Sequence, residues 1–273
     1  MAKTVEGAVK TKKAVASVEE AKLQEFVAYC KQFEVFSERE QEVEQIMYAI
    51  LQREHVLLKG APGTAKSMLA MSMLKGISSA KIFKTQFTAF MDEQYVFGPQ
   101  LIDELKQGRI VHNTTNSLAD VDFAFLDEFF NANEETIVSC NEVLNERTFT
   151  RNNQQIACPL NTAIMTTNQE RETEKKLKPI YDRIFFTSKV IRVADGMARK
   201  AMYRNALSGK LNSFQSQFSM DDLRSIHAWI DSTDVRVSEA ILEAFDNLLR
   251  DYQQEANEYI SDRKAIKSLR FLS

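Results

Sequence analysis

The sequence has no long hydrophobic run and few of the residues that loosen a chain. No apolar stretch approaches the ~20 residues that a bilayer-spanning helix needs, and residues 1–20 lack the hydrophobic stretch of a signal peptide. With eight glycines, four prolines and no internal repeat, the chain offers few flexible linkers. These absences argue against an integral membrane protein or a repeat protein, and they predict a soluble, cytoplasmic one.

Cysteine and excess positive charge are also scarce. The three cysteines have neither metal-ligand spacing nor an even count, which predicts reduced thiols in a cytosolic protein: Cys30, Cys140 and Cys158. The 35 basic and 38 acidic residues give a formal net charge of −3 and a pI of about 5.8. A general nucleic-acid binder carries a marked positive excess, so nucleic acid is not an expected partner, although a local basic patch stays open.

The 273 residues, 44% of them hydrophobic, are enough for a sizeable core in one large or two modest domains. From Phe26 onward, helical segments alternate with short apolar runs, which is typical of a parallel sheet flanked by helices. Nearly continuous apolar runs are expected to form central strands buried on both faces. These runs are Val56–Leu58, Phe123–Leu126, Ala163–Met165 and Ile184–Phe186.

The pattern predicts three parts along the chain. Residues 1–20 are expected to be a mobile arm or frayed helix, and residues 21–193 the α/β core. After about Val193 the spacing of apolar residues becomes helical. Residues 194–273 are therefore expected to form a smaller helical domain, with one helix marked by Val237, Ile241, Phe245 and Leu248.

A phosphate-binding loop is predicted directly after the first apolar run. It consists of Gly60, Ala61, Pro62, Gly63, Thr64, Ala65, Lys66 and Ser67, and a helical run over residues 68–74 follows. A strand that enters a glycine-containing turn and then a helix aims backbone N–H groups and the helix dipole at one point, where phosphates can bind. Lys66 is expected to reach the β and γ phosphates of ATP, and Ser67 to bind Mg²⁺. Ala65 replaces a usual glycine, which removes backbone freedom.

Two carboxylates follow the apolar run at residues 123–126. Asp127 and Glu128 there resemble a Walker B motif. Asp127 is expected to bind Mg²⁺, directly or through water, and Glu128 to polarise the water that attacks ATP. A pair of acidic residues in a solvated loop is the alternative, and the preceding phosphate loop favours the functional interpretation.

Asn168 ends the run at residues 163–167 and is delivered to the same edge of the predicted sheet. This is the position of sensor 1 in AAA+ proteins. Its amide can hydrogen-bond both the γ-phosphate and the water, and so report whether the phosphate is present. Asn is also a common turn residue after a strand, which is the structural alternative.

The chain resembles the MoxR-type AAA+ ATPases, and among them the RavA group, over roughly residues 33–272. Besides the nucleotide motifs, three segments carry the resemblance: Glu93–Pro99 resembles "EEVFGP", Gly108-Arg109 the hairpin inserted in helix 2, and Asn141–Arg147 the "LLxxINER" helix. The RavA group is also similar in having alanine before the lysine of the loop. The resemblance implies a P-loop AAA+ core followed by a helical lid.

The resemblance also assigns roles to two arginines. Arg183, in an Asp-Arg pair before an apolar run, looks like the arginine finger offered to a neighbouring subunit, where the transition state needs a positive charge. An ion pair within the subunit is the alternative for Arg183, and Arg147 is a rival for the interface role. Ser261-Asp262-Arg263 reads as a helix N-cap and resembles sensor 2, in which Arg263 would touch the nucleotide phosphates; an exposed Arg263 balanced by Asp262 is the alternative.

The family implies a homo-oligomeric, hexameric ring that hydrolyses ATP and remodels protein partners, often including a von Willebrand factor A domain protein. RavA proteins continue beyond the lid, so partner specificity held in those further domains is not expected to transfer. A P-loop kinase is the first alternative, since it also needs Lys66, Ser67 and an acidic strand end. A nucleotide-dependent scaffold or DNA-associated AAA+ subunit is the second.

Overall fold

The structure is a computed structural model that describes residues 18–151, 154–169, 177–212, 214, 218–233, 237–256 and 260–272. The chain divides into two compact units, Met1–His227 and Ala228–Ser273, which are considered separately below. Of the predicted arm, residues 1–17 lie outside the described residues, and residues 18–20 begin a helix that runs to residue 31. In the described part of the chain, no helix is both long and apolar enough to cross a membrane.

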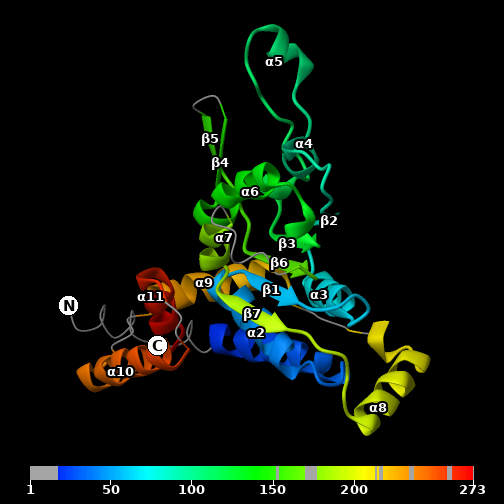
Figure 1. Ribbon diagram of the computed structural model, residues 1–273, viewed down its shortest axis with the longest axis vertical. Helices are drawn as coiled ribbons and strands as arrows, with labels where there is room; N and C mark the ends of the chain where they lie inside the picture. The colour runs from blue at the N-terminus through cyan, green and yellow to red at the C-terminus, as the bar shows by residue number, and fades with distance from the viewer. Residues whose placement is uncertain are drawn as a thin grey trace, which may run out of the picture. The chain divides into compact units, whose positions relative to one another are not determined.

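A parallel sheet forms the centre of the first unit (Figure 1). Its five strands lie in the order β2-β3-β6-β1-β7, and every neighbouring pair is parallel. The strands are β1 (Val56–Lys59), β2 (Ile82–Gln86), β3 (Phe123–Asp127), β6 (Thr162–Thr167) and β7 (Phe186–Lys189). Two further strands, β4 (Thr148–Arg151) and β5 (Gln154–Ala157), pair antiparallel in a separate hairpin. The predicted α/β class is confirmed.

Three of the four apolar runs are central strands, and the fourth prediction is wrong in part. β7 begins only at Phe186, lies at the edge of the sheet and is half exposed. Ile184 instead caps helix α7 (Lys178–Arg183), and its buried side chain packs in the core between helices and sheet. The sequence pattern also missed β2, because this edge strand carries polar residues and is not continuously apolar.

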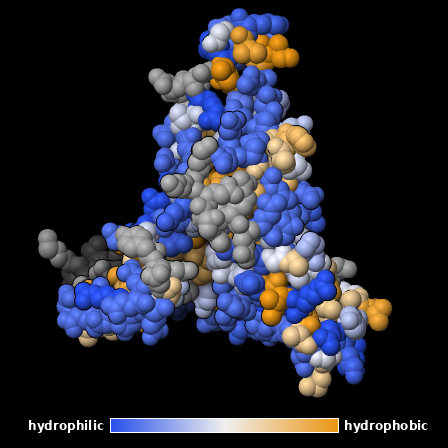
Figure 2. Space-filling model, in the orientation of Figure 1, coloured by the Kyte–Doolittle hydropathy of each residue, from blue (hydrophilic) through white to orange (hydrophobic). Residues whose placement is uncertain are grey.

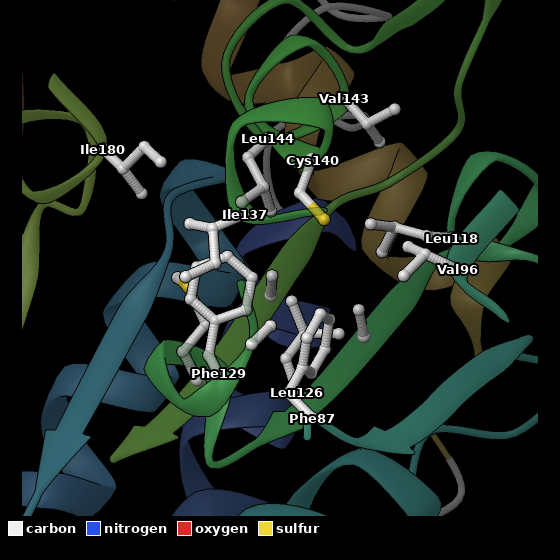
Figure 3. Close-up of a cluster of buried hydrophobic side chains, with 14 of the residues drawn as sticks. Phe87, Val96, Leu118, Leu126, Phe129, Ile137, Cys140, Val143, Leu144 and Ile180 are labelled. Carbon is white, nitrogen blue, oxygen red and sulfur yellow. The ribbon is translucent and has the colours of Figure 1, made fainter. Parts of the chain in front are cut away.

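Helices of the first unit cover both faces of the sheet (Figure 1). The alternation of side chains along each strand sends Leu57, Leu126 and Met165 to one face. There they belong to one buried cluster with Ile137 and Cys140 of α6 (Figure 3). Besides the helix at residues 18–31, the described helices of this unit are α2 (Glu40–Gln52), α3 (Lys66–Lys75), α4 (Glu93–Phe97), α5 (Ile102–Lys106), α6 (Glu134–Glu146), α7 and α8 (Gly196–Leu207), and α9 (Met220–Ser232) begins in this unit and ends in the second.

The other face of the sheet carries the neighbouring strand residues. Thr162 of β6 donates its hydroxyl to the carbonyl of Ala49 in α2, at 3.0 Å. Because side chains alternate along a strand, Thr166 shares this face of β6 with Thr162. Phe125 of β3 pairs with Ile164 of β6, so their side chains lie on the same face of the sheet. Asp127 and Thr166 each follow two residues later and therefore share that face. This arrangement brings both residues to the side of the sheet where α2 packs.

A segment around α5 extends away from the sheet beyond α4 (Figure 1). It contains Gly108 and Arg109, the residues that resemble the helix-2 hairpin of the family. Arg109 pairs with Glu104 at 2.6 Å. Apolar side chains are exposed on this segment, as the orange patch in Figure 2 shows: Leu101, Ile102, Leu105 and Ile110.

Two helices make up most of the described part of the second unit. They are α10 (Glu239–Ala256) and α11 (Asp262–Leu272). The predicted helical spacing is confirmed for Ile241, Phe245 and Leu248, whereas Val237 lies before α10 begins. Ser261 caps α11 as expected, since its hydroxyl accepts a hydrogen bond from the N–H of Lys264 at 3.3 Å.

Candidate functional site

The predicted phosphate loop joins β1 to α3 in the first unit. Helix α3 begins at Lys66, and Ala65 precedes it as the N-cap in the left-handed conformation, with φ 64° and ψ 15°. Ala65 thus has the backbone that glycine adopts most easily, at a cost of about 1–2 kcal/mol for an L-residue. Gly60 is required for a different reason: a Cβ there would lie 2.2 Å from the carbonyl oxygen of Val190.

Lys66 lies over the loop that precedes it. Its Nζ donates to the carbonyl oxygens of Gly60 at 2.7 Å and Ala61 at 3.0 Å, and the residue is only 6% exposed. Burial lowers the pKa of the Lys66 ammonium, and the negative charges of Glu128 and Asp127 oppose that shift. The loop therefore holds a buried cation near two carboxylates.

The two carboxylates at the end of β3 meet the loop and the end of β6. Asp127 Oδ1 accepts hydrogen bonds from Ser67 Oγ at 3.4 Å and from Thr166 Oγ1 at 2.5 Å. Glu128 Oε2 accepts from the backbone N–H of Asn168 at 3.1 Å, so Asn168 meets Glu128 through its main chain. The structure thus brings Ser67, Asp127, Glu128 and Asn168 together.

A cavity of about 590 Å³ adjoins the phosphate loop. Apolar side chains and three arginines line much of it: Phe36, Met68, Met202, Tyr203, Leu211, Arg39, Arg192 and Arg199. Gly63, Thr64 and Ala65 form the loop side of the wall. An apolar cavity with a few polar groups is the usual form of a small-molecule site. The cavity leaves no pattern in the sequence, because its walls come from segments between residues 36 and 211.

Arg39 belongs to this wall and was not among the predicted site residues. It is 5% exposed, and its Nη2 donates to the carbonyl oxygens of Ile191 at 2.5 Å and Thr64 at 3.4 Å. Arg39 therefore ties the phosphate loop to the segment that follows β7. A buried arginine is rare unless it is paired, but only the folded arrangement shows which carbonyl groups it serves.

The two candidate finger arginines have different surroundings. Arg183 Nη1 donates to Asn141 Oδ1 at 2.8 Å and to the carbonyl of Pro179 at 3.3 Å. Arg147 Nη2 donates to the carbonyls of Arg53 at 2.7 Å and Asn161 at 3.1 Å. Burial lowers the pKa of the Arg147 guanidinium to about 10. Arg147 thus has structural contacts within the chain that favour a packing role for it.

The oxygen-rich group of Ser67 and Asp127 fits Mg²⁺, a hard cation that prefers oxygen ligands and is commonly held by one or two protein groups together with phosphates. Among the described residues, no cluster of three or more His, Cys, Asp or Glu could hold a metal ion by itself. The fit is therefore to a metal shared with a phosphate ligand. Arg263 is the second residue of α11 in the second unit, and its role stays a prediction.

A family model for the "MoxR domain in the MoxR-vWA-beta-propeller ternary systems" matches residues 21–228. The chain belongs to the MoxR family. It is 30% identical to the uncharacterized protein MJ0079 of Methanocaldococcus jannaschii over 241 residues, which are 86% of this chain and 60% of that protein. It is 35% identical to MJ0812 of the same organism over 158 residues, 58% of this chain and 42% of that protein. This MoxR chain therefore spans only part of the length of both relatives.

The fold also matches a solved structure. A crystal structure of a candidate ATPase from Cytophaga hutchinsonii superposes with a TM-score of 0.72 at 19% identity, covering 96% of this chain and 82% of that one. At that level of identity the match shows a shared fold.

Proposed function

We propose that this MoxR protein binds ATP with Mg²⁺ and hydrolyses it at the site formed by the phosphate loop and the end of β3. The observation that carries the proposal is the meeting of Lys66, Ser67, Asp127 and Glu128 at one end of the parallel sheet. Ligands of open α/β sheets bind at the carboxyl ends of the strands, and a triphosphate needs a cation, backbone donors and metal ligands there.

Each residue has a chemical task in this proposal. Lys66 stabilises the charge of the β and γ phosphates, and Ser67 and Asp127 hold Mg²⁺. Bound Mg²⁺ would neutralise phosphate charge that develops during the reaction. Glu128 orients and polarises the attacking water, and Asn168 is the sensor of the γ-phosphate. The remaining loop residues Gly60 to Ala65 contribute backbone N–H groups.

The cavity beside the loop is the proposed site of the nucleotide base. Its volume of about 590 Å³ and its apolar residues suit a flat heterocycle, and the loop residues Gly63 to Ala65 form one of its walls. Arg39 would hold this wall against the loop, because it hydrogen-bonds the carbonyl of Thr64 on one side and that of Ile191 on the other.

Two finer assignments belong to the proposal. We assign the chain to the RavA-like branch on the strength of segments 93–99 and 141–147. We also propose a ring, hexameric in the family, in which Arg183 acts on the ATP of a neighbouring subunit and Arg263 acts as sensor 2. The ring would remodel a protein partner, and the family description makes a von Willebrand factor A domain protein the first candidate.

The active-site assignment is tested with paired variants. Lys66→Ala should lose ATP binding in calorimetry, while Lys75→Ala, on the exposed end of the same helix, should keep it. Glu128→Gln should bind ATP but hydrolyse it at least about 100-fold more slowly, as expected for loss of a group that acts on the water. Unchanged binding by Lys66→Ala, or full turnover by Glu128→Gln, would refute the assignment.

The ring is tested by mixing inactive subunits. Arg183→Ala and Lys66→Ala chains, each inactive alone, should together recover part of the ATPase activity, because mixed interfaces pair an intact Arg183 with an intact phosphate loop. No recovery at any mixing ratio would point to a role for Arg183 within its own subunit, as its contact with Asn141 allows. Affinity capture with Glu128→Gln in ATP should then retain the protein partner.

A further inference from the structure

One buried hydroxyl contacts both carboxyl-bearing residues of the proposed site. Thr166 lies on β6 with no exposed surface. Its Oγ1 donates to Asp127 Oδ1 at 2.5 Å and accepts a hydrogen bond from the backbone N–H of Glu128 at 3.0 Å. A hydroxyl has a single proton, so donating to Asp127 fixes its rotation and leaves its lone pairs toward Glu128. Both hydrogen bonds of the Thr166 hydroxyl, the one that it donates and the one that it accepts, are therefore fixed.

The contact to Glu128 falls at an unfavourable backbone position. Glu128 has φ 50° and ψ 42°, in the left-handed region that non-glycine residues seldom adopt. Such a conformation persists only when its surroundings fix it. Three hydrogen bonds hold Glu128: its carbonyl accepts the N–H of Asn131 at 2.8 Å, its own N–H is bonded to Thr166, and its carboxylate accepts the N–H of Asn168. Thr166 and Asn168 lie at and just after the end of β6.

We propose that Thr166 is the positioning residue of the site, whose hydroxyl orients the Asp127 carboxylate and holds the Glu128 backbone in its left-handed turn. The inference rests on the proposed roles of Asp127 and Glu128 in ATP hydrolysis. Thr166 itself is fully buried, and its hydroxyl bonds the Asp127 carboxylate and the Glu128 backbone. Its effect on turnover must therefore pass through them.

The adjacent residue provides a matched control. Thr167 is also buried on β6, and its hydroxyl is equally used, but it bonds Gln169: Oγ1 donates to the carbonyl at 3.2 Å and accepts the N–H at 3.0 Å. Thr→Val replaces the hydroxyl by a methyl of similar size. Thr166→Val and Thr167→Val therefore delete the same group from the same strand, and only the first removes a contact to the carboxylates.

Two measurements separate positioning from a general loss of structure. We expect Thr166→Val to lower kcat for ATP about tenfold or more with little change in KM, because a hydrogen bond to a charged group is lost. Independently of activity, amide hydrogen exchange at Glu128 should speed up about tenfold in the nucleotide-free protein. Thr166→Ser should stay near wild type in both, and Thr167→Val should keep wild-type exchange at Glu128 and wild-type kcat.

Several results would overturn the inference. These are unchanged exchange at Glu128 in Thr166→Val, an equal loss of kcat in Thr167→Val, or a Thr166→Ser protein as impaired as Thr166→Val. If Thr166→Val does not fold, Thr166→Ser and Thr166→Ala are compared instead, since both lack the methyl and only serine keeps the hydroxyl. Equal kcat values in that pair would then refute the positioning role.

The proposed function fails separately from this inference. If Glu128→Gln and Asp127→Ala both retain full ATPase activity, the assignment of the site is wrong. If those variants are inactive while Thr166→Val is unimpaired, the site stands and only the role of Thr166 is lost.

Discussion

Replacing Ala65 by glycine should stabilise the protein, although glycine usually weakens a helix. Ala65 has φ 64° and ψ 15°, and an L-residue in this left-handed region costs about 1–2 kcal/mol relative to its preferred conformations. Glycine avoids that cost, but an unfolded chain with glycine has more conformational entropy to lose on folding, which offsets about 0.4–1 kcal/mol of the gain. The middle of both ranges gives an expected net gain of about 0.8 kcal/mol for Ala65→Gly.

The gain is measured by chemical unfolding of the nucleotide-free protein. Ala65→Gly should raise the denaturant midpoint without a change in slope, and it should raise Tm by about 1–4 °C for a chain of this size. Ala61 provides the control, because it belongs to the same loop but does not have a positive φ. Ala61→Gly should be neutral or destabilising. A destabilised Ala65→Gly protein would refute the left-handed assignment and with it the described shape of the loop.

Three further predictions concern the surroundings of the site. Gly60→Ala should destabilise the fold by about 1–3 kcal/mol in denaturant titrations, because the added Cβ would meet the Val190 carbonyl at 2.2 Å; wild-type stability would contradict this packing. Two backbone N–H donors lower the pKa of Glu38 in the folded protein, so its stabilising effect is present above its unfolded pKa and is lost as pH falls through the lowered folded pKa. The difference in unfolding free energy between wild type and Glu38→Gln should therefore shrink below about pH 4, and a difference that stays constant with pH would refute this role. A thiol reagent at pH 8 should leave the native cysteines unmodified and label all three after unfolding, because burial raises their pKa values to about 11–12, and rapid labelling of the native protein would refute their burial: Cys30, Cys140 and Cys158.

The parts of the fold that the sequence predicted are those set by local pattern. The run at residues 123–126 is apolar throughout because β3 is central and covered on both faces. The loop at residues 60–67 joins a strand directly to a helix, so its geometry follows from consecutive residues. The strand predicted at residues 184–186 is wrong in part. Ile184 is apolar because it packs in the core at the end of a helix, and the strand begins only at Phe186. Periodicity alone does not separate those two reasons for an apolar residue.

The site was predictable up to the point where contacts depend on tertiary packing. Asp127 and Asn168 could be assigned to one edge because parallel strands share their carboxyl ends. Thr166 could have been found by the same logic, since it is a polar residue near the carboxyl end of β6 on the face that Asp127 shares. Arg39 could not have been found in this way, because its acceptors are the backbone carbonyls of Thr64 and Ile191. These residues are distant from it in sequence, and every residue type has a backbone carbonyl.

The most direct test of the account is a crystal structure of the protein with a nonhydrolysable ATP analogue and Mg²⁺. We expect phosphates against the backbone N–H groups of residues 60–67, the metal beside Ser67 and Asp127, and the base in the cavity next to Phe36. An analogue bound elsewhere, or a metal far from both oxygen ligands, would contradict it.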